Sequence, residues 1–77
     1  MNNKTSQKTI NKIKSLGKNI AVRRKELKYS QNKFSEKINI SREHLAKIET
    51  AKRAVSLDLL IEIAEELNTT VKELIDF

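Results

Sequence analysis

The chain has 77 residues, of which 38% are hydrophobic and 34% charged, and this balance indicates one small, soluble globular domain and not a disordered segment. It contains no cysteine, which excludes disulfides, thiol nucleophiles and thiolate metal sites; no apolar run is long enough to span a membrane and no signal peptide is visible, so a cytoplasmic location is expected. The net charge is +6, but residues 1–53 carry 15 Lys and Arg against 4 Asp and Glu, a net of +11, whereas residues 54–77 carry 1 Lys against 6 acids, a net of −5.

This uneven charge distribution favours a nucleic-acid partner over the alternative, a basic surface that serves solubility alone. A polyanion would be attracted to the basic part and repelled by the acidic part, which orients the protein before any base is touched. The chain has no proline, a single glycine and almost no β-branched alternation, so the sequence predicts an all-α fold.

Residues 1–14 are polar and basic, and we expect them to form an N-terminal arm before a folded domain of residues 15–77. Ile10, Ile13 and Leu16 recur at three-residue spacing, which is compatible with a first helix that begins within the arm. Up to about Thr9 a loosely ordered tail is the favoured prediction. The arm could instead reach DNA phosphate or pack on a partner, and the sequence leaves these two alternatives open.

A pair of opposite charges is predicted to connect two helices. Residues 16–28 should form the first helix of the domain, and its inner face consists of Leu16, Ile20 and Leu27. Arg24 lies on this apolar stripe, and Glu49 lies on the apolar stripe of the third predicted helix. Each charge alone would be costly there, whereas the two can be accommodated together. We therefore predict a partly buried ion pair between Arg24 and Glu49 that fixes the angle between the helices.

The middle of the chain predicts two short helices joined by a tight turn. Ser30 is a favourable N-cap for a helix of residues 31–38, and Ser41 is a favourable N-cap for a helix of residues 42–50. Between them stands Asn39, a residue type that adopts a left-handed backbone at low cost. This arrangement is a helix-turn-helix.

The last third of the chain predicts two more helices. Ser56 should cap a helix of residues 57–67, and Thr70 with Glu73 forms a capping box for a final short helix. The acids of the fourth helix lie on one face, which is typical of a solvated surface and not of paired catalytic carboxylates. The loop before this helix carries two cations suited to phosphate, Lys52 and Arg53.

Taken together, these segments resemble the Cro/repressor-type (XRE) helix-turn-helix family of DNA-binding proteins. The matching segments, in the family's order, are RRKEL (23–27), SQ (30–31), ISREHLAKIE (40–49), AKR (51–53) and SLDLLIEIAEELNTT (56–70). The resemblance implies an all-α, compact five-helix bundle of the lambda-repressor-like type, with the helix-turn-helix at residues 30–50 and the same ion pair between Arg24 and Glu49. The family usually has Gly where Ala51 stands and often Pro near Val55, so the shape of this loop could differ.

The outer face of the third helix carries the candidate base-reading residues. Arg42 suits the O6 and N7 atoms of guanine, Glu43 can accept from the amino group of cytosine, and Lys47 can reach guanine or phosphate. Glu43 could instead serve only the helix dipole. His44 is a candidate for phosphate or a base edge, and as the single histidine it cannot assemble a metal site alone.

Phosphate contacts are expected where the two helices of the motif begin. Ser30 and Gln31 stand at the start of one helix, where free backbone N–H groups attract anions, and Ser41, at the start of the next, can contact phosphate or a base edge. The family resemblance implies that positions 31, 41, 42, 43 and 47 form the usual contact set.

The C-terminal end has more apolar residues than a five-helix core obviously needs, namely Ile61, Val71, Ile75 and Phe77. They could complete the core, but the family resemblance implies a dimer interface, which we favour. We therefore predict a sequence-specific double-stranded DNA-binding regulator that acts as a homodimer on a palindromic operator. With no effector domain evident it would repress by occupying a promoter, as phage repressors, restriction-modification controllers and antitoxins do.

Other classes of function fit the sequence less well. A protein-interaction module that retains the fold without reading DNA is disfavoured by the polar, basic face of the third helix. A basic amphipathic segment on a membrane is disfavoured because Gly17 and Arg24 interrupt the apolar stripe. An enzyme is not expected, since the chain has one His, no Cys and no phosphate-binding glycine loop, and neither a cofactor, a metal nor a small-molecule substrate is predicted.

Overall fold

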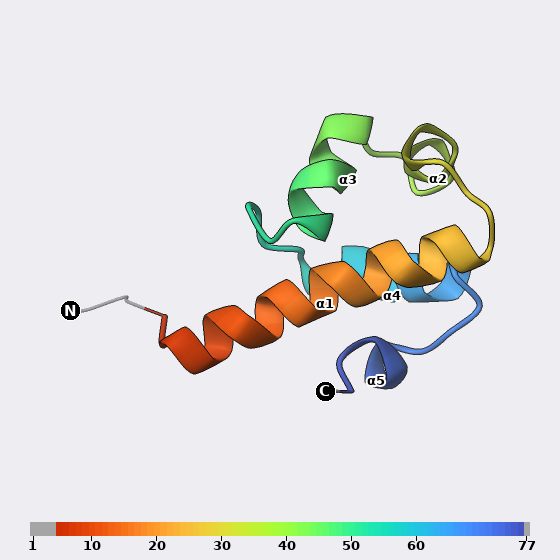
Figure 1. Cartoon of the computed structure of the whole chain (residues 1–77). Helices are drawn as coiled ribbons and strands as arrows, with labels where there is room; N and C mark the ends of the chain where they lie inside the picture. The colour runs from red at the N-terminus through yellow and green to blue at the C-terminus, as the bar shows by residue number, and fades with distance from the viewer. Residues whose placement is uncertain (1–4, 77) are drawn as a thin grey trace.

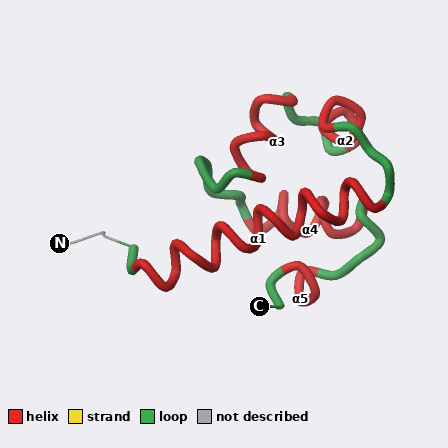
Figure 2. The backbone as a smooth tube through the Cα atoms, in the orientation of Figure 1, coloured by secondary structure: helices red, strands yellow, loops and turns green. Residues whose placement is uncertain are grey.

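The computed structural model describes residues 5–76 and contains five helices and no strand within that range, which confirms the predicted all-α fold (Figure 1). The helices are α1 (Gln7–Glu26), α2 (Gln31–Lys37), α3 (Arg42–Glu49), α4 (Leu57–Glu66) and α5 (Val71–Leu74). Short loops connect them from α1 to α5 (Figure 2). None of these helices is both long enough and apolar enough to cross a membrane.

Each helix begins at a Ser or Thr N-cap, and this explains where the chain becomes helical. The capping residues, each of which accepts a hydrogen bond from a backbone N–H three residues on, are Ser6, Ser30, Ser41, Ser56 and Thr70. The last four were predicted from the sequence and are confirmed. Such a bond satisfies one of the backbone donors that a helix start leaves free.

The first four helices are each followed by a residue with a left-handed backbone. These residues, with positive φ angles of 53° to 63°, are Lys28, Asn39, Ala51 and Asn68. Asn39 was predicted in this role and is confirmed. Ala51 has a φ of 60° at the position where the Cro/repressor-type family usually has glycine. The loop therefore adopts the left-handed backbone that glycine favours, although alanine has a Cβ atom.

Helix α1 begins earlier than the sequence suggested. The segment up to Thr9 was favoured as a loosely ordered tail, yet the helix starts at Gln7. The physical reason is a local cap: the Ser6 hydroxyl accepts a hydrogen bond from the Thr9 backbone N–H, and the Gln7 side chain donates to that of Asn11. The helix ends at Glu26 and not at Lys28, because Lys28 is left-handed.

The core joins apolar residues from all five helices, and α2 and α3 lie on one side of α1 with α5 on the other (Figure 1). Its fully buried centre consists of Ile20, Phe34, Leu45, Ile63 and Leu67. These residues come from α1, α2, α3, α4 and the C-cap of α4, so the helix-turn-helix is packed onto the same apolar cluster as the rest of the domain.

Gly17 allows α1 and α3 to approach closely. A Cβ atom at this position would lie 2.6 Å from the carbonyl oxygens of both Ile48 and Glu49, at the end of α3. These are backbone atoms, which cannot rotate away as a side chain could. The contact between α1 and the end of α3 therefore requires a glycine at this position.

Candidate DNA-binding site

Helix α3 is held by its inner face and presents its outer face to solvent. Leu45 and Ile48 are buried in the core, whereas Arg42, Glu43 and Lys47 are exposed. This division follows the helical period, because the exposed residues stand opposite the apolar stripe. The three side chains predicted to read bases therefore share an accessible side of the helix.

The turn between α2 and α3 sets the position of the outer helix. Ile38 is buried at the end of α2, Ile40 packs against the core, and the backbone N–H of Ile40 donates to the carbonyl oxygen of Ser35 at 3.0 Å. Asn39 is exposed between them with its left-handed backbone. The turn is thus fixed on both sides by apolar residues that contact the core.

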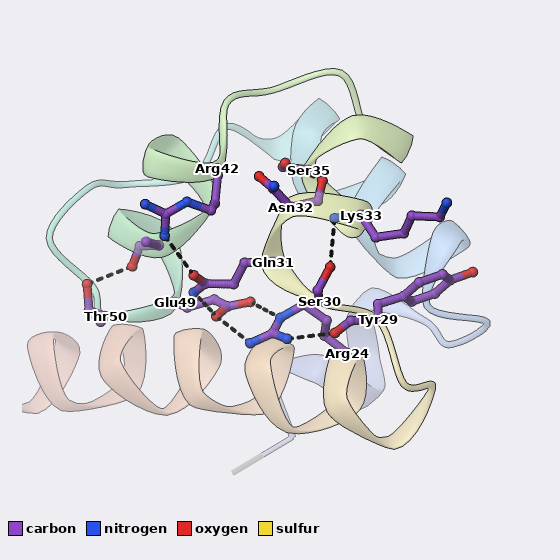
Figure 3. Close-up of polar contacts among 11 residues, drawn as sticks. Arg24, Tyr29, Ser30, Gln31, Asn32, Lys33, Ser35, Arg42, Glu49 and Thr50 are labelled. Atoms are coloured by element: carbon purple, nitrogen blue, oxygen red, sulfur yellow. Dashed lines mark hydrogen bonds and ion pairs between the residues drawn. The ribbon is translucent and has the colours of Figure 1, made fainter.

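The predicted ion pair between Arg24 and Glu49 is present (Figure 3). Nε of Arg24 donates to Oε2 of Glu49 at 2.7 Å, and Nη2 donates to Oε1 at 3.1 Å. The exposed fractions of the two side chains are only 7% and 5%. Nη1 of Arg24 donates to the carbonyl oxygen of Tyr29 at 2.8 Å, which connects the pair to the segment before α2. Geometry of this bidentate kind gives the strongest protein ion pairs.

Gln31 extends the ion pair to the surface of α3, a connection that the sequence did not indicate. Its Nε2 donates to Oε1 of Glu49 at 2.9 Å, and its Oε1 accepts a longer hydrogen bond, 3.5 Å, from Nη1 of Arg42 (Figure 3). The hydrogen bonds thus run from buried Arg24 through Glu49 and Gln31 to exposed Arg42. The sequence predicted Gln31 as a phosphate contact, whereas here its amide engages two protein partners.

The two serine caps of the motif keep a free hydrogen-bond donor. The hydroxyl oxygens of Ser30 and Ser41 accept from the backbone N–H groups of Lys33 and His44, each at 3.0 Å. A hydroxyl that accepts in this way still has its own O–H to donate, for example to a phosphate oxygen. Both serines are exposed.

The loop after α3 folds back onto the end of that helix. The backbone N–H groups of Lys52 and Arg53 both donate to the carbonyl oxygen of Lys47, at 2.8 Å and 3.3 Å. The side chains of Lys52 and Arg53 are exposed, and His44 is half-buried. The loop thus holds two cations beside the C-terminal end of the exposed helix.

The residues predicted to form a dimer interface have different environments. Ile61 and Ile75 are 44% and 45% exposed, whereas Val71 is half-buried and packs against the core. Phe77 lies outside the described residues. In residues 5–76 no cluster of three or more His, Cys, Asp or Glu side chains is arranged to hold a metal ion.

The short helix pair, its capped turn and its exposed polar outer helix define a helix-turn-helix domain. A sequence profile of the family described as helix-turn-helix matches residues 20–74. The chain therefore belongs to this XRE-type helix-turn-helix family, which consists of DNA-binding transcriptional regulators.

Solved structures with the same fold support the assignment of architecture. Two crystal structures of the clp gene regulator ClgR from Corynebacterium glutamicum superpose with TM-scores of 0.78 and 0.77, each at 21% sequence identity. The matched region covers 82% of this chain, and 67% and 82% of the respective ClgR chains. No curated protein matches the sequence.

Proposed function

We propose that this protein binds a specific double-stranded DNA operator and represses transcription by occupying it. The observation that carries the proposal is the outer face of α3, where Arg42 and Lys47 are exposed and the cationic loop of Lys52 and Arg53 folds back onto the end of the helix. A helix of this kind fits the major groove, where each base pair presents a distinct pattern of donors and acceptors. The flanking cations suit the phosphates on either side.

The roles of the individual side chains follow from their positions. Arg42 would donate to a guanine, Glu43 would accept from a cytosine amino group, and Lys47 would reach a guanine or a phosphate. Gln31 supports this role of Arg42, because the hydrogen bond between them limits the orientations of the guanidinium. The hydroxyls of Ser30 and Ser41 would donate to phosphate oxygens.

We propose that the protein acts as a homodimer on a palindromic site. Two copies related by a two-fold axis would place their α3 helices in successive major grooves, so that half-site centres lie about 34 Å apart. The exposed Ile61 and Ile75 support an interface at the C-terminal end of the chain. Phage repressors, restriction-modification controllers and antitoxins are the kinds of regulator that this arrangement suits.

Selection of bound DNA from a random pool would test this function. We expect a palindromic consensus, and affinity for it that falls steeply as salt rises, because phosphate contacts release counterions. Arg42→Ala with Lys47→Ala should abolish the preference for the consensus, whereas Lys25→Ala, an exposed change on α1, should leave it intact. Equal, weak binding to every sequence would contradict the proposal, and absence of DNA binding would favour a protein-interaction module.

A further inference from the structure

The N-terminal half of α1 projects from the bundle (Figure 1). All buried residues of this helix, Gly17, Ile20 and Arg24, lie in its C-terminal half. Residues 7–14 are exposed apart from half-buried Ile10. A single helix of this length is marginally stable in water unless one face is covered. We call residues 7–16 the projecting helix.

An apolar hollow lies where the projecting helix passes the end of α5. Its volume is about 390 Å³, and it is lined by Thr9, Lys12, Ile13, Leu16 and Ile75. Ile13 is 39% exposed and Ile75 45%. The backbone of DNA would leave such apolar surface uncovered, whereas side chains of another protein would fill it.

The charges beside the hollow indicate that the protein covering it is a second copy of the same chain. The projecting helix carries Lys8, Lys12 and Lys14, and no acid precedes Glu26 in the sequence. Helices α4 and α5 are mostly acidic, with one exposed base, Lys72. Their exposed acids are Asp58, Glu62, Glu65, Glu66, Glu73 and, just after α5, Asp76. The same part of the chain exposes Leu57 and Ile61, at 69% and 44%, one helical turn apart on α4.

A dimer that joined two copies of the acidic surface face to face would be opposed by its own charges. Like charges brought together across an interface repel each other and suppress association. Contact between the acidic surface of one copy and the basic projecting helix of the other removes this repulsion and covers apolar residues on both sides.

We propose that the projecting helix packs against α4 of a second copy, with Ile13 against Leu57 and Ile61, and with Lys8 and Lys12 beside Glu62 and Glu65. Two-fold symmetry makes the contact reciprocal, so that each copy gives one helix and receives one. This inference rests on the proposed homodimer and specifies the surfaces that form it.

A charge-swap experiment tests the contact without DNA. One variant carries Lys8→Glu and Lys12→Glu, and a second carries Glu62→Lys and Glu65→Lys. In each variant alone both reciprocal contacts become repulsive, so the dissociation constant measured by sedimentation equilibrium should rise at least about tenfold. In an equimolar mixture of the two, both contacts pair opposite charges again, and a heterodimer should form.

Two further variants separate the contact from net charge and from folding. Lys25→Glu with Lys28→Glu makes the same change in net charge on exposed residues outside the projecting helix, and should leave the dimer intact. Ile13→Asp should dissociate the dimer and leave the core folded, because the side chain is already 39% exposed and lies outside the buried core. Any loss of helical signal should be confined to the projecting helix.

Three other results would contradict either the proposed interface or the DNA-binding function, and the experiment distinguishes them. If the dimer is unchanged by Lys8→Glu with Lys12→Glu while DNA affinity falls more than in the control, the projecting helix belongs to the DNA interface and the proposal is overturned. A monomer that still selects an operator would overturn the interface and leave the DNA-binding function standing. A charge-swapped heterodimer that selects no operator would support the interface and contradict the DNA-binding function.

Discussion

The guanidinium of Arg24 makes its hydrogen bonds inside the protein, to Glu49 and to the carbonyl oxygen of Tyr29. Removal of either charge leaves the other buried without a partner, which costs far more than the pair itself contributes. The stability of the domain and the position of α3 therefore depend on the same two residues.

We expect Arg24→Ala to lower the free energy of unfolding by about 3–5 kcal/mol, the usual cost of stranding a buried charge. Thermal and urea denaturation would measure it, with Lys25→Ala on the exposed side of α1 as the control. Arg24→Met combined with Glu49→Met should lose less than the two single changes together, since no charge is then left unpaired. A melt of Arg24→Ala that matches the parent would disprove a stabilising role.

Replacement of Arg42 and replacement of Lys52 should have different effects on DNA binding. Arg42→Ala should reduce operator affinity by about 1–3 kcal/mol and relax the preference at one base position. Lys52→Ala should weaken binding to every sequence alike and lower the slope of log affinity against log salt by about 1. Binding titrations on the selected operator and on point-mutated operators distinguish the two, and identical behaviour of the two variants would contradict the assigned roles.

At the scale of helices and loops, the turn after α3 contains a measurable strain. Ala51 has a left-handed backbone, which costs a residue with a Cβ atom roughly 1–2 kcal/mol. Ala51→Gly should therefore stabilise the protein by about 1 kcal/mol after the entropy of the more flexible unfolded chain is counted. Urea denaturation checks this, and Ala54→Gly in the same loop, where φ is not positive, should show no gain.

The start of α4 gives a prediction in pH. The Ser56 hydroxyl, followed by the backbone N–H groups of Leu59 and Asp58, lowers the pKa of the Asp58 carboxyl below its ordinary value of 3.8. A lowered folded-state pKa contributes stability that is present above the ordinary value and lost as pH falls through the folded value. Ser56→Ala should raise the pKa of Asp58 in an NMR titration. Loss of the cap should also lower the stability of the variant by about 1 kcal/mol, and this loss should be larger at neutral pH than below the pKa of Asp58 in the parent protein. Thr70→Ala, at the cap of α5, should leave this pKa unchanged.

Local features of these elements could be predicted because their causes lie within a few residues. Ser30 and Asn39 mark the start of α2 and the turn after it by their own chemistry. The start of α1 was missed because the Ser6 cap precedes a polar stretch with no dense apolar pattern. The ion pair between Arg24 and Glu49, 25 positions apart, could be predicted because each is a charge on an apolar stripe. The contact between Gln31 and Glu49 was missed because an uncharged amide beside an N-cap gives no such sign of a buried partner.

For the whole molecule, the uneven charge has two consequences that reinforce each other. The net charge of +11 on residues 1–53 would attract DNA, and the net charge of −5 on residues 54–77 would be repelled by it. In the proposed dimer the basic projecting helix of one subunit is also attracted to the acidic α4 of the other. Salt should therefore weaken operator binding twice, through phosphate contacts and through the interface. The overall charge could be read from the sequence, but the exposure of Ile13 beside Ile75 required the three-dimensional arrangement.

The close contact at Gly17 restricts which residue this position can accept. Any other amino acid there brings a Cβ atom into the backbone of α3 and would displace the helix as a unit. Arg42 and Lys47 are exposed and can be exchanged at small cost in folding. Side chains on the outer face of α3 can therefore be replaced without disturbing the fold, whereas Gly17, which sets the distance between α3 and α1, cannot.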